Sequence, residues 1–202
     1  MASRSTSIEY AAHPAREMEE QFIASLKERT GRTLDEWSDL IRSDAPEGVR
    51  EVAGWLKSEH GMGANYAKTV AQRAATGRSE RDDPVGLVDA LYSGKKSHLR
   101  PIHDELMRVA LGLGDDVRAC PGKSVVSLYR EHVFANAKPT TQKRVDLGLA
   151  LKRVKRRPTN RLIDTGGGAK GDRITHRIPL ESVEEIDDDV RGWLKAAYDA
   201  DE

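Results

Sequence analysis

The sequence is poor in cysteine and has no long hydrophobic run. Cys120 is the only cysteine among 202 residues, so no disulfide can form within the chain, and a reducing compartment fits best. A membrane-spanning helix is excluded because no stretch of about 18 uninterrupted apolar residues occurs. The first residues also lack the apolar core of a signal peptide. These absences predict a cytoplasmic protein that does not enter a membrane.

Aromatic residues are scarce as well, at 5% of the chain, whereas charged residues make up 33%. This composition suits a helix-rich protein with well-solvated surfaces. Apolar residues nevertheless recur at helix and strand spacings, which excludes a chain that is disordered throughout. The length allows one ordinary domain or two small ones.

The stretch GRSERDDP, residues 77–84, contains Gly and Pro but no hydrophobic side chain that a core needs. We therefore place a domain boundary there. The predicted organisation is a flexible tail over residues 1–14, a small helical domain over 15–77, a linker over 78–84 and an α+β domain over 85–202.

Helical spacing of apolar residues predicts four short helices in the first domain, with Gly31, Gly61 and Gly77 placed at helix ends. Thr33 and Glu36 have the spacing of a capping box. In the second domain, Ile102 begins an apolar helical face, and residues 144–152 alternate between apolar and other side chains, as a strand with one buried face does. A last helix follows residue 182. The predicted fold class is α+β, a four-helix domain followed by a helix, an antiparallel sheet and a helix.

Seven motifs occur in order between residues 16 and 198: TGRTLDEW, WLKSEHGMGANYA, RPIHDEL, VVSLYR, FANAKPTTQKRVDLGLAL, THRIPL and WLKAAY. Together they resemble a bacterial family that pairs two domains of unknown function, the second sometimes labelled a predicted transport protein. The resemblance implies the two-domain order but no settled activity. The order of elements in the second domain is also similar to frataxin-like proteins, which hold iron with acidic residues on their first helix. Here the helix 98–113 offers only Asp104 and Glu105 as carboxylates.

The charge of the chain is unevenly distributed. Lys plus Arg and Asp plus Glu are equal in number, at 33 each, yet residues 138–161 hold nine basic residues and one acidic residue. The stretch includes a strand end and a loop that contains Pro158. We predict that it binds nucleic acid or another polyanion through phosphate contacts and counterion release. The predicted contacts are Lys143, Arg144, Lys152, Arg153, Lys155, Arg156, Arg157 and Arg161.

An alternative for the same stretch is that its charge is solvated or paired within the protein. Residues 181–202 contain nine acidic and two basic residues, and they would mask the basic stretch if both lay on one side of the domain. The sequence leaves both possibilities open.

A second nucleic-acid signal is Gly61-Met62-Gly63, followed by Lys68 on the next helix. It resembles a helix-hairpin-helix, in which a glycine turn points the first N–H groups of a helix at a DNA phosphate. The alternative is a helix that simply ends at a glycine and is followed by another.

A different function remains open, in which the α+β domain binds a small anionic ligand in a pocket. Its candidate lining residues are Lys123, Ser127, Arg130, Arg144, Asp146 and His176. The histidines have no zinc-binding spacing and Cys120 has no identifiable catalytic partner. We therefore predict a binding protein without metal or other cofactor rather than an enzyme, of unknown oligomeric state.

Overall fold

The structure is a computed structural model that describes residues 8–77 and 83–201. These residues form two compact units, and each is described by itself. Residues 13–77 form the helical unit, and residues 8–12 together with 83–201 form the α+β unit. The helical unit is thus an insertion near the N-terminus of the α+β unit. Residues 1–7 of the predicted tail and 78–82 of the predicted linker lie outside the described residues.

Residues 13–77 form five helices, one more than the sequence predicted. They are α1 (Ala15–Ala24), α2 (Leu26–Thr30), α3 (Leu34–Asp44), α4 (Val49–Ser58) and α5 (Ala64–Thr76). The first predicted helix is divided at Ser25, whose ψ is 2° and whose hydroxyl donates to the Phe22 carbonyl. The capping box of Thr33 and Glu36 is confirmed at the start of α3.

The helical unit has its own hydrophobic core. Leu26, Leu56 and Val70 are fully buried in it, and Trp37 is nearly so. These side chains come from α2, α3, α4 and α5, so the core ties the short helices together. A separate core is what an independently folding unit needs.

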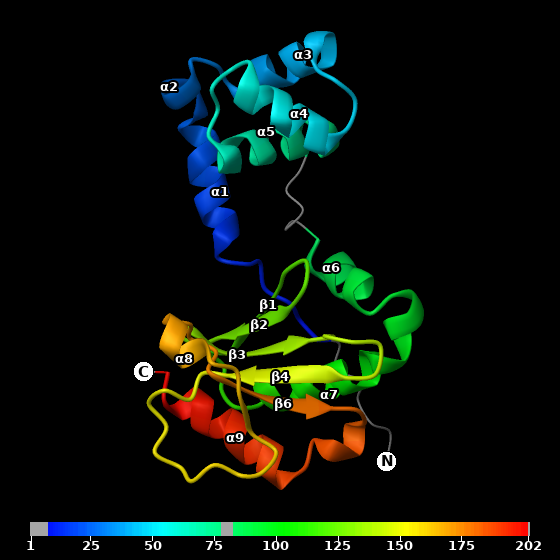
Figure 1. Cartoon of the computed structure of the whole chain (residues 1–202), viewed down its shortest axis with the longest axis vertical. Coiled ribbons are helices and arrows are strands. Elements are labelled where there is room, and N and C mark those ends of the chain that lie inside the picture. Colours follow the sequence, from blue (N-terminus) through cyan, green and yellow to red (C-terminus); the bar gives the residue numbers. More distant parts are fainter. Residues whose placement is uncertain (1–7, 78–82, 202) are drawn as a thin grey trace. The chain divides into compact units, whose positions relative to one another are not determined.

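The α+β unit begins with helices and continues with a six-stranded antiparallel sheet (Figure 1). Its first part consists of α6 (Pro84–Leu91), the 3₁₀ helix η2 (Gly94–Leu99) and α7 (Arg100–Leu111). The strands are β1 (Arg118–Pro121), β2 (Val126–Tyr129), β3 (Val133–Lys138), β4 (Val145–Leu149), β5 (Ile163–Asp164) and β6 (His176–Leu180), in the spatial order β1-β2-β3-β4-β6-β5. The short helix α8 (Gly167–Lys170) precedes β6, and η3 (Val183–Glu185) and α9 (Asp188–Asp199) follow it.

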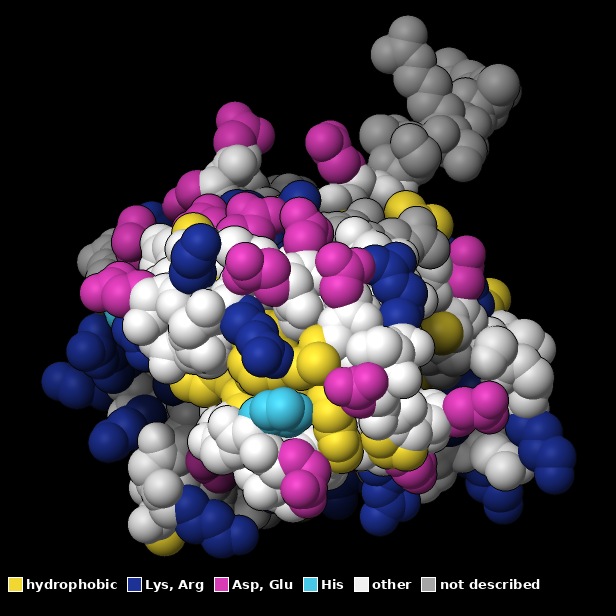
Figure 2. All heavy atoms as spheres, turned by 90° about the horizontal axis from the view of Figure 1, so that it is seen from above, with side chains coloured by type: hydrophobic (Ala, Val, Ile, Leu, Met, Phe, Trp, Pro, Cys, Tyr) yellow, Lys and Arg dark blue, Asp and Glu magenta, His cyan; other side chains and the backbone are white. Residues whose placement is uncertain are grey.

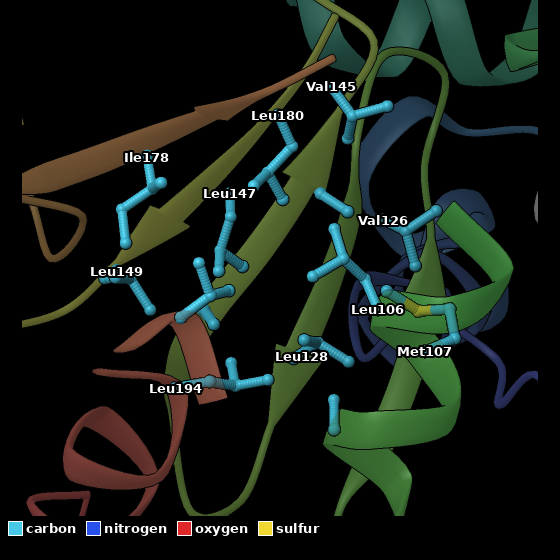
Figure 3. Close-up of a cluster of buried hydrophobic side chains, with 14 of the residues drawn as sticks. Leu106, Met107, Val126, Leu128, Val145, Leu147, Leu149, Ile178, Leu180 and Leu194 are labelled. Atoms are coloured by element: carbon cyan, nitrogen blue, oxygen red, sulfur yellow. The ribbon is translucent and has the colours of Figure 1, made fainter. Parts of the chain in front are cut away.

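One face of the sheet forms the core with α7 and α9 (Figure 3). Leu147 on β4 and Ile178 on β6 are paired neighbours in the sheet, and both are fully buried. Leu106 of α7 and Leu194 of α9 belong to the same core, so both helices cover this face. The strand predicted for residues 144–152 is present but ends at Leu149, and all five residues of β4 are buried, so both of its faces are covered and not only the predicted one. The α+β fold class is confirmed.

Two predicted boundaries are wrong. Residue 84 belongs to α6 rather than to the linker, because Asp83 caps that helix through the Gly86 N–H and Pro84 fits its first turn. The last α-helix does not start after residue 182. It starts at Asp188, where the Asp187 carboxylate accepts from the Val190 N–H and caps α9.

No helix in the described ranges is both long and apolar enough to cross a membrane. Figure 2 shows one face of the molecule, on which Lys and Arg side chains are interspersed with Asp and Glu around an apolar area. On this face the two signs of charge are therefore mixed.

Candidate functional site

The basic loop, residues 152–161, lies against the acidic start of α9. Arg161 donates to the Asp187 carboxylate at 2.6 Å and to the Glu185 carbonyl at 2.9 Å. The Arg156 guanidinium is 3.3 Å from the Asp189 carboxylate and lies over the Trp193 ring at 4.3 Å from its centre. The N–H of Val190, with a smaller contribution from Arg161, holds the pKa of Asp187 below its usual range.

Two further residues contribute to the contact between the basic loop and α9. The Thr159 hydroxyl donates to Asp189 at 3.1 Å and accepts from the Trp193 indole N–H at 3.2 Å. A Cβ at Gly192 would lie 2.8 Å from a guanidinium nitrogen of Arg156, so a glycine here leaves room for that side chain. Of the two possibilities that the sequence left open, internal pairing therefore holds for Arg156 and Arg161.

Most of the other predicted polyanion contacts are exposed at the surface and are not paired with α9. Lys143, Lys152, Lys155 and Arg157 are exposed, and no carboxylate among residues 8–77 and 83–201 pairs with them. Arg153 is exposed too. The basic loop thus keeps part of its charge at the surface while two of its arginines are used to hold α9.

The six predicted pocket residues do not converge. Arg144 and Asp146 do meet, at 2.9 Å, but Arg130 pairs with Asp116 at 2.8 Å and lies over the Tyr198 ring. Ser127 is on β2, two strands away from Asp146 on β4.

His176 and Lys123 are positioned by other parts of the unit. The His176 ring bonds to the neighbouring Thr175 hydroxyl at 2.9 Å and is partly exposed. Lys123 lies in the turn between β1 and β2. The six residues thus come from several separate parts of the unit, and among them only Arg144 and Asp146 are in direct contact in the described part of the chain.

Sequence reasoning missed the second partner of Asp146. Arg177 on β6 donates to the other carboxylate oxygen at 3.0 Å, so the nearly buried Asp146, 7% exposed, is held between two guanidinium groups. The signal was the strand alternation: Arg177 precedes the core residue Ile178 and faces the opposite side of the sheet. One carboxylate between two guanidinium groups leaves the trio with a net charge of +1, and both arginine side chains are partly exposed.

A hollow of about 510 Å³ lies at one end of the sheet and carries four lysines. Its walls come from the end of α6 and η2, the β1–β2 turn, and the end of β3 with the turn that follows. It is lined by Ala90, Leu91, Ser93, Lys95, Lys96, Lys123, Ser124, Lys138, Pro139, Thr140 and Gln142. We call this set the lysine hollow. No Asp or Glu is among its lining residues.

One lysine of the hollow is fixed by the backbone. Lys96 donates from Nζ to the Pro139 carbonyl at 2.6 Å, which ties η2 to the turn after β3. Lys95 and Lys138 are exposed and make no ion pair with any described residue. Ser124 adds a hydroxyl group, which can donate a hydrogen bond to an anion. The hydroxyls of Ser93 and Thr140 instead donate to the carbonyls of Ala90 and Lys138.

The glycine turn of the helical unit has the hairpin form that the sequence suggested. Gly61 has a φ of +61°, which favours glycine, and Met62 is buried under the turn and donates its N–H to the Leu56 carbonyl. Gly63 then starts α5 without a side-chain cap, and Lys68 is exposed one turn later. The first N–H groups of α5 therefore lack a side-chain acceptor at the cap position.

Metal binding has no obvious place in the described part of the chain. Across residues 8–77 and 83–201, no three His, Cys, Asp or Glu side chains gather as metal ligands would. Asp104 and Glu105, the carboxylates considered for iron, are paired with Arg100, and with Arg108 and Arg191, respectively.

Comparison with known protein families identifies the family to which the chain belongs. A family described as a domain of unknown function, DUF5655, matches residues 88–201, which is more than half of the chain. The chain belongs to the DUF5655 family. A second domain of unknown function, DUF4287, matches residues 19–76. The predicted resemblance to a family that pairs two such domains is confirmed.

The DUF5655 match covers all six strands, α7 and α9, and it includes every lining residue of the lysine hollow. The DUF4287 match includes the Gly61 turn. Curated proteins and solved structures gave no match, so the similarity to frataxin-like proteins stays a prediction from topology.

Proposed function

We propose that the DUF5655 unit is a binding module for a small phosphate-bearing anion, which it holds in the lysine hollow. The observation that supports this most is the gathering of four lysines around one hollow whose lining contains no carboxylate. Lys95, Lys96 and Lys138 bring like charges to one hollow, and an anion between them lowers their mutual repulsion. The proposal includes a bacterial setting, which the resemblance implies, and a cytoplasmic one, which the single cysteine favours.

The size of the hollow favours a ligand larger than inorganic phosphate. About 510 Å³ lies within the range of small-molecule sites, roughly 300–1,000 Å³. Ala90 and Leu91 give it an apolar wall, against which an uncharged part of the ligand can pack. The proposed ligand is therefore a phosphorylated small molecule, with its phosphate on the lysines. The proposed role is binding, through charge-assisted hydrogen bonds, and no bond is made or broken.

A thermal shift experiment tests this proposal. Inorganic pyrophosphate, a compact probe for the lysines, is added to the full chain at low ionic strength. The melting temperature of the α+β unit should rise with pyrophosphate concentration, because a ligand that binds only the folded state stabilises it. Sodium chloride of matched ionic strength is the control. The proposal fails if pyrophosphate and a nucleoside triphosphate raise the melting temperature no more than that salt does.

A second candidate function, binding of a nucleic-acid backbone, is favoured by the Gly61 turn. There the uncapped N–H groups of α5 and the exposed Lys68 offer donors for a phosphate. The exposed Lys152, Lys155 and Arg157 of the basic loop add positive charge elsewhere in the chain. Arg156 and Arg161 are not among the proposed phosphate contacts, because they are paired with carboxylates at the start of α9.

The salt dependence of DNA binding separates this candidate from the first. Each phosphate contact contributes about 0.9 to the slope of log affinity against log salt for duplex DNA. We expect Lys155→Ala/Arg157→Ala to lower this slope by about 1.8 in an anisotropy titration, whereas Lys95→Ala/Lys138→Ala leaves it unchanged. The absence of DNA binding at low salt would eliminate this candidate.

A further inference from the structure

Residues 8–12, which we call the N-terminal strap, are held on the α+β unit by a few contacts. The Ala11 N–H donates to the Ala119 carbonyl on β1 at 2.9 Å, and the Cys120 thiol donates to the Ala12 carbonyl at 3.7 Å. Ile8 and Tyr10 pack against the core. These residues belong to the predicted tail, so this part of the tail is a docked segment.

The strap covers a buried histidine. The Tyr10 hydroxyl is hydrogen-bonded to Nε2 of His103 on α7, at 2.9 Å, and His103 is fully buried. The ring of Tyr92 lies 4.7 Å from that of His103. Neither Nδ1 of His103 nor the hydroxyl of Tyr92 has a hydrogen-bond partner among the described residues. The docked strap therefore encloses polar atoms that a solvent-exposed arrangement would satisfy.

The charges around His103 favour its neutral form. Burial, followed by the nearby Arg100 guanidinium, lowers the pKa of His103 to about 3. Arg100 is itself paired with Asp89 of α6 and Asp104 of α7, both at 2.7 Å. No carboxylate among the described residues accepts a hydrogen bond from His103.

The remaining neighbours do not titrate near neutral pH. Burial raises the pKa of Tyr10 to about 12, and it raises the pKa of Tyr92 further. His103 is thus the group in this cluster whose charge can change in mild acid once it is exposed.

The strap also lies next to one of the two points at which the chain passes between the units. The helical unit joins the α+β unit at residues 12–13 and again at 82–83. The strap is therefore the docked end of one of the two connections. Segments held by few backbone hydrogen bonds are at the low-stability end of a fold and open locally. Releasing the strap frees one attachment of the helical unit without unfolding the sheet.

We propose that the N-terminal strap is a pH-dependent latch, docked while His103 is neutral and released when His103 binds a proton. Release removes Tyr10 from Nε2 and admits water to the imidazole, so that both ring nitrogens can donate. This inference goes beyond anion binding and does not depend on it.

The sign of the pH dependence follows from the two states of His103. In the docked state the pKa is about 3, and in the released state we take the ordinary value of about 6.5. The released state binds more protons between these values, so docking is complete above about pH 6.5 and weakens as the pH falls. The ratio of docked to released strap decreases about thirtyfold between about pH 7.5 and 5.0.

The reactivity of the Cys120 thiol measures the release of the latch. Cys120 is the only cysteine, it is buried, and its thiol donates to the Ala12 carbonyl of the strap. The full chain is reacted with 4,4′-dithiodipyridine at several pH values. Each rate is divided by the rate of the urea-unfolded chain at the same pH, which removes the effect of thiol ionisation. We expect the normalised rate to rise about thirtyfold from about pH 7.5 to 5.0. Tryptophan fluorescence should stay native over this range.

His103→Phe keeps a buried ring but cannot bind a proton, so its normalised rate should not change with pH. Tyr10→Phe, a milder change, should label faster at neutral pH and keep the rise in acid. His98→Gln is the matched control, since His98 is an exposed neighbour, and should behave as the unmodified chain. A flat rate in the unmodified chain, a full rise in His103→Phe, or labelling that follows global unfolding would overturn the proposal.

Discussion

Trp193→Ala is expected to destabilise the α+β unit by about 3–5 kcal/mol, the usual cost of removing a large aromatic side chain from a core. Trp193 is 1% exposed and belongs to the core that α9 shares with the sheet. Its indole N–H also bonds to Thr159, and its ring receives the Arg156 guanidinium. The substitution thus leaves a cavity and loosens the basic loop at the same time.

Urea unfolding followed by circular dichroism measures this loss. Trp193→Phe is the matched control, because it fills most of the space but lacks the indole N–H. One hydrogen bond contributes about 1 kcal/mol, so the control should lose roughly that amount. If Trp193→Ala lost no more than Trp193→Phe, the close contact between the basic loop, α9 and the core would be contradicted.

Lys95→Ala/Lys138→Ala is expected to weaken pyrophosphate binding by about a hundredfold. A hydrogen bond to a charged group contributes about 1.5–3 kcal/mol, and about 1.4 kcal/mol corresponds to a tenfold change in affinity. The two lysines make no ion pair with any described residue, so their removal should leave the folded state intact. Isothermal titration calorimetry at low ionic strength gives the affinities directly.

The control for this prediction is Lys152→Ala/Lys155→Ala. It removes the same charge from the basic loop, and both of its lysines are exposed. We expect it to change the affinity for pyrophosphate by less than about threefold, as the screening of distant charges implies. An equal loss in both variants would mean that net charge rather than the lysine hollow governs binding.

Much of the fold could be predicted from the sequence, because burial leaves a periodic trace. The alternation around Leu147 predicted the strand β4, although all five of its residues are buried and not those of one face alone, and helical spacing from Ile102 predicted α7. Glycines and caps predicted several ends, such as Gly31 and Thr33. The start of the last helix was mispredicted at residue 182, because both Ser182 and Asp187 are residues that can cap a helix. The residue that caps α9 is Asp187.

The site was much harder to predict, because its members come from distant segments. Lys95 is in η2, Lys123 is in the β1–β2 turn and Lys138 ends β3, and only the fold brings these three segments together. The basic stretch stood out in the sequence as a continuous run, yet Arg156 and Arg161 turned out to pair with α9. Charge along a sequence reports composition, whereas the charge available to a partner depends on which carboxylates the fold places nearby.

The lysine hollow can be located in solution by nuclear magnetic resonance. Pyrophosphate is titrated into ¹⁵N-labelled full chain at low ionic strength and the amide shifts are followed. We predict saturable shifts at residues 93–96, 123–124 and 138–142, with no comparable change in the basic loop or at the Gly61 turn. Shifts confined to those other segments, or no saturable shift at all, would contradict the account.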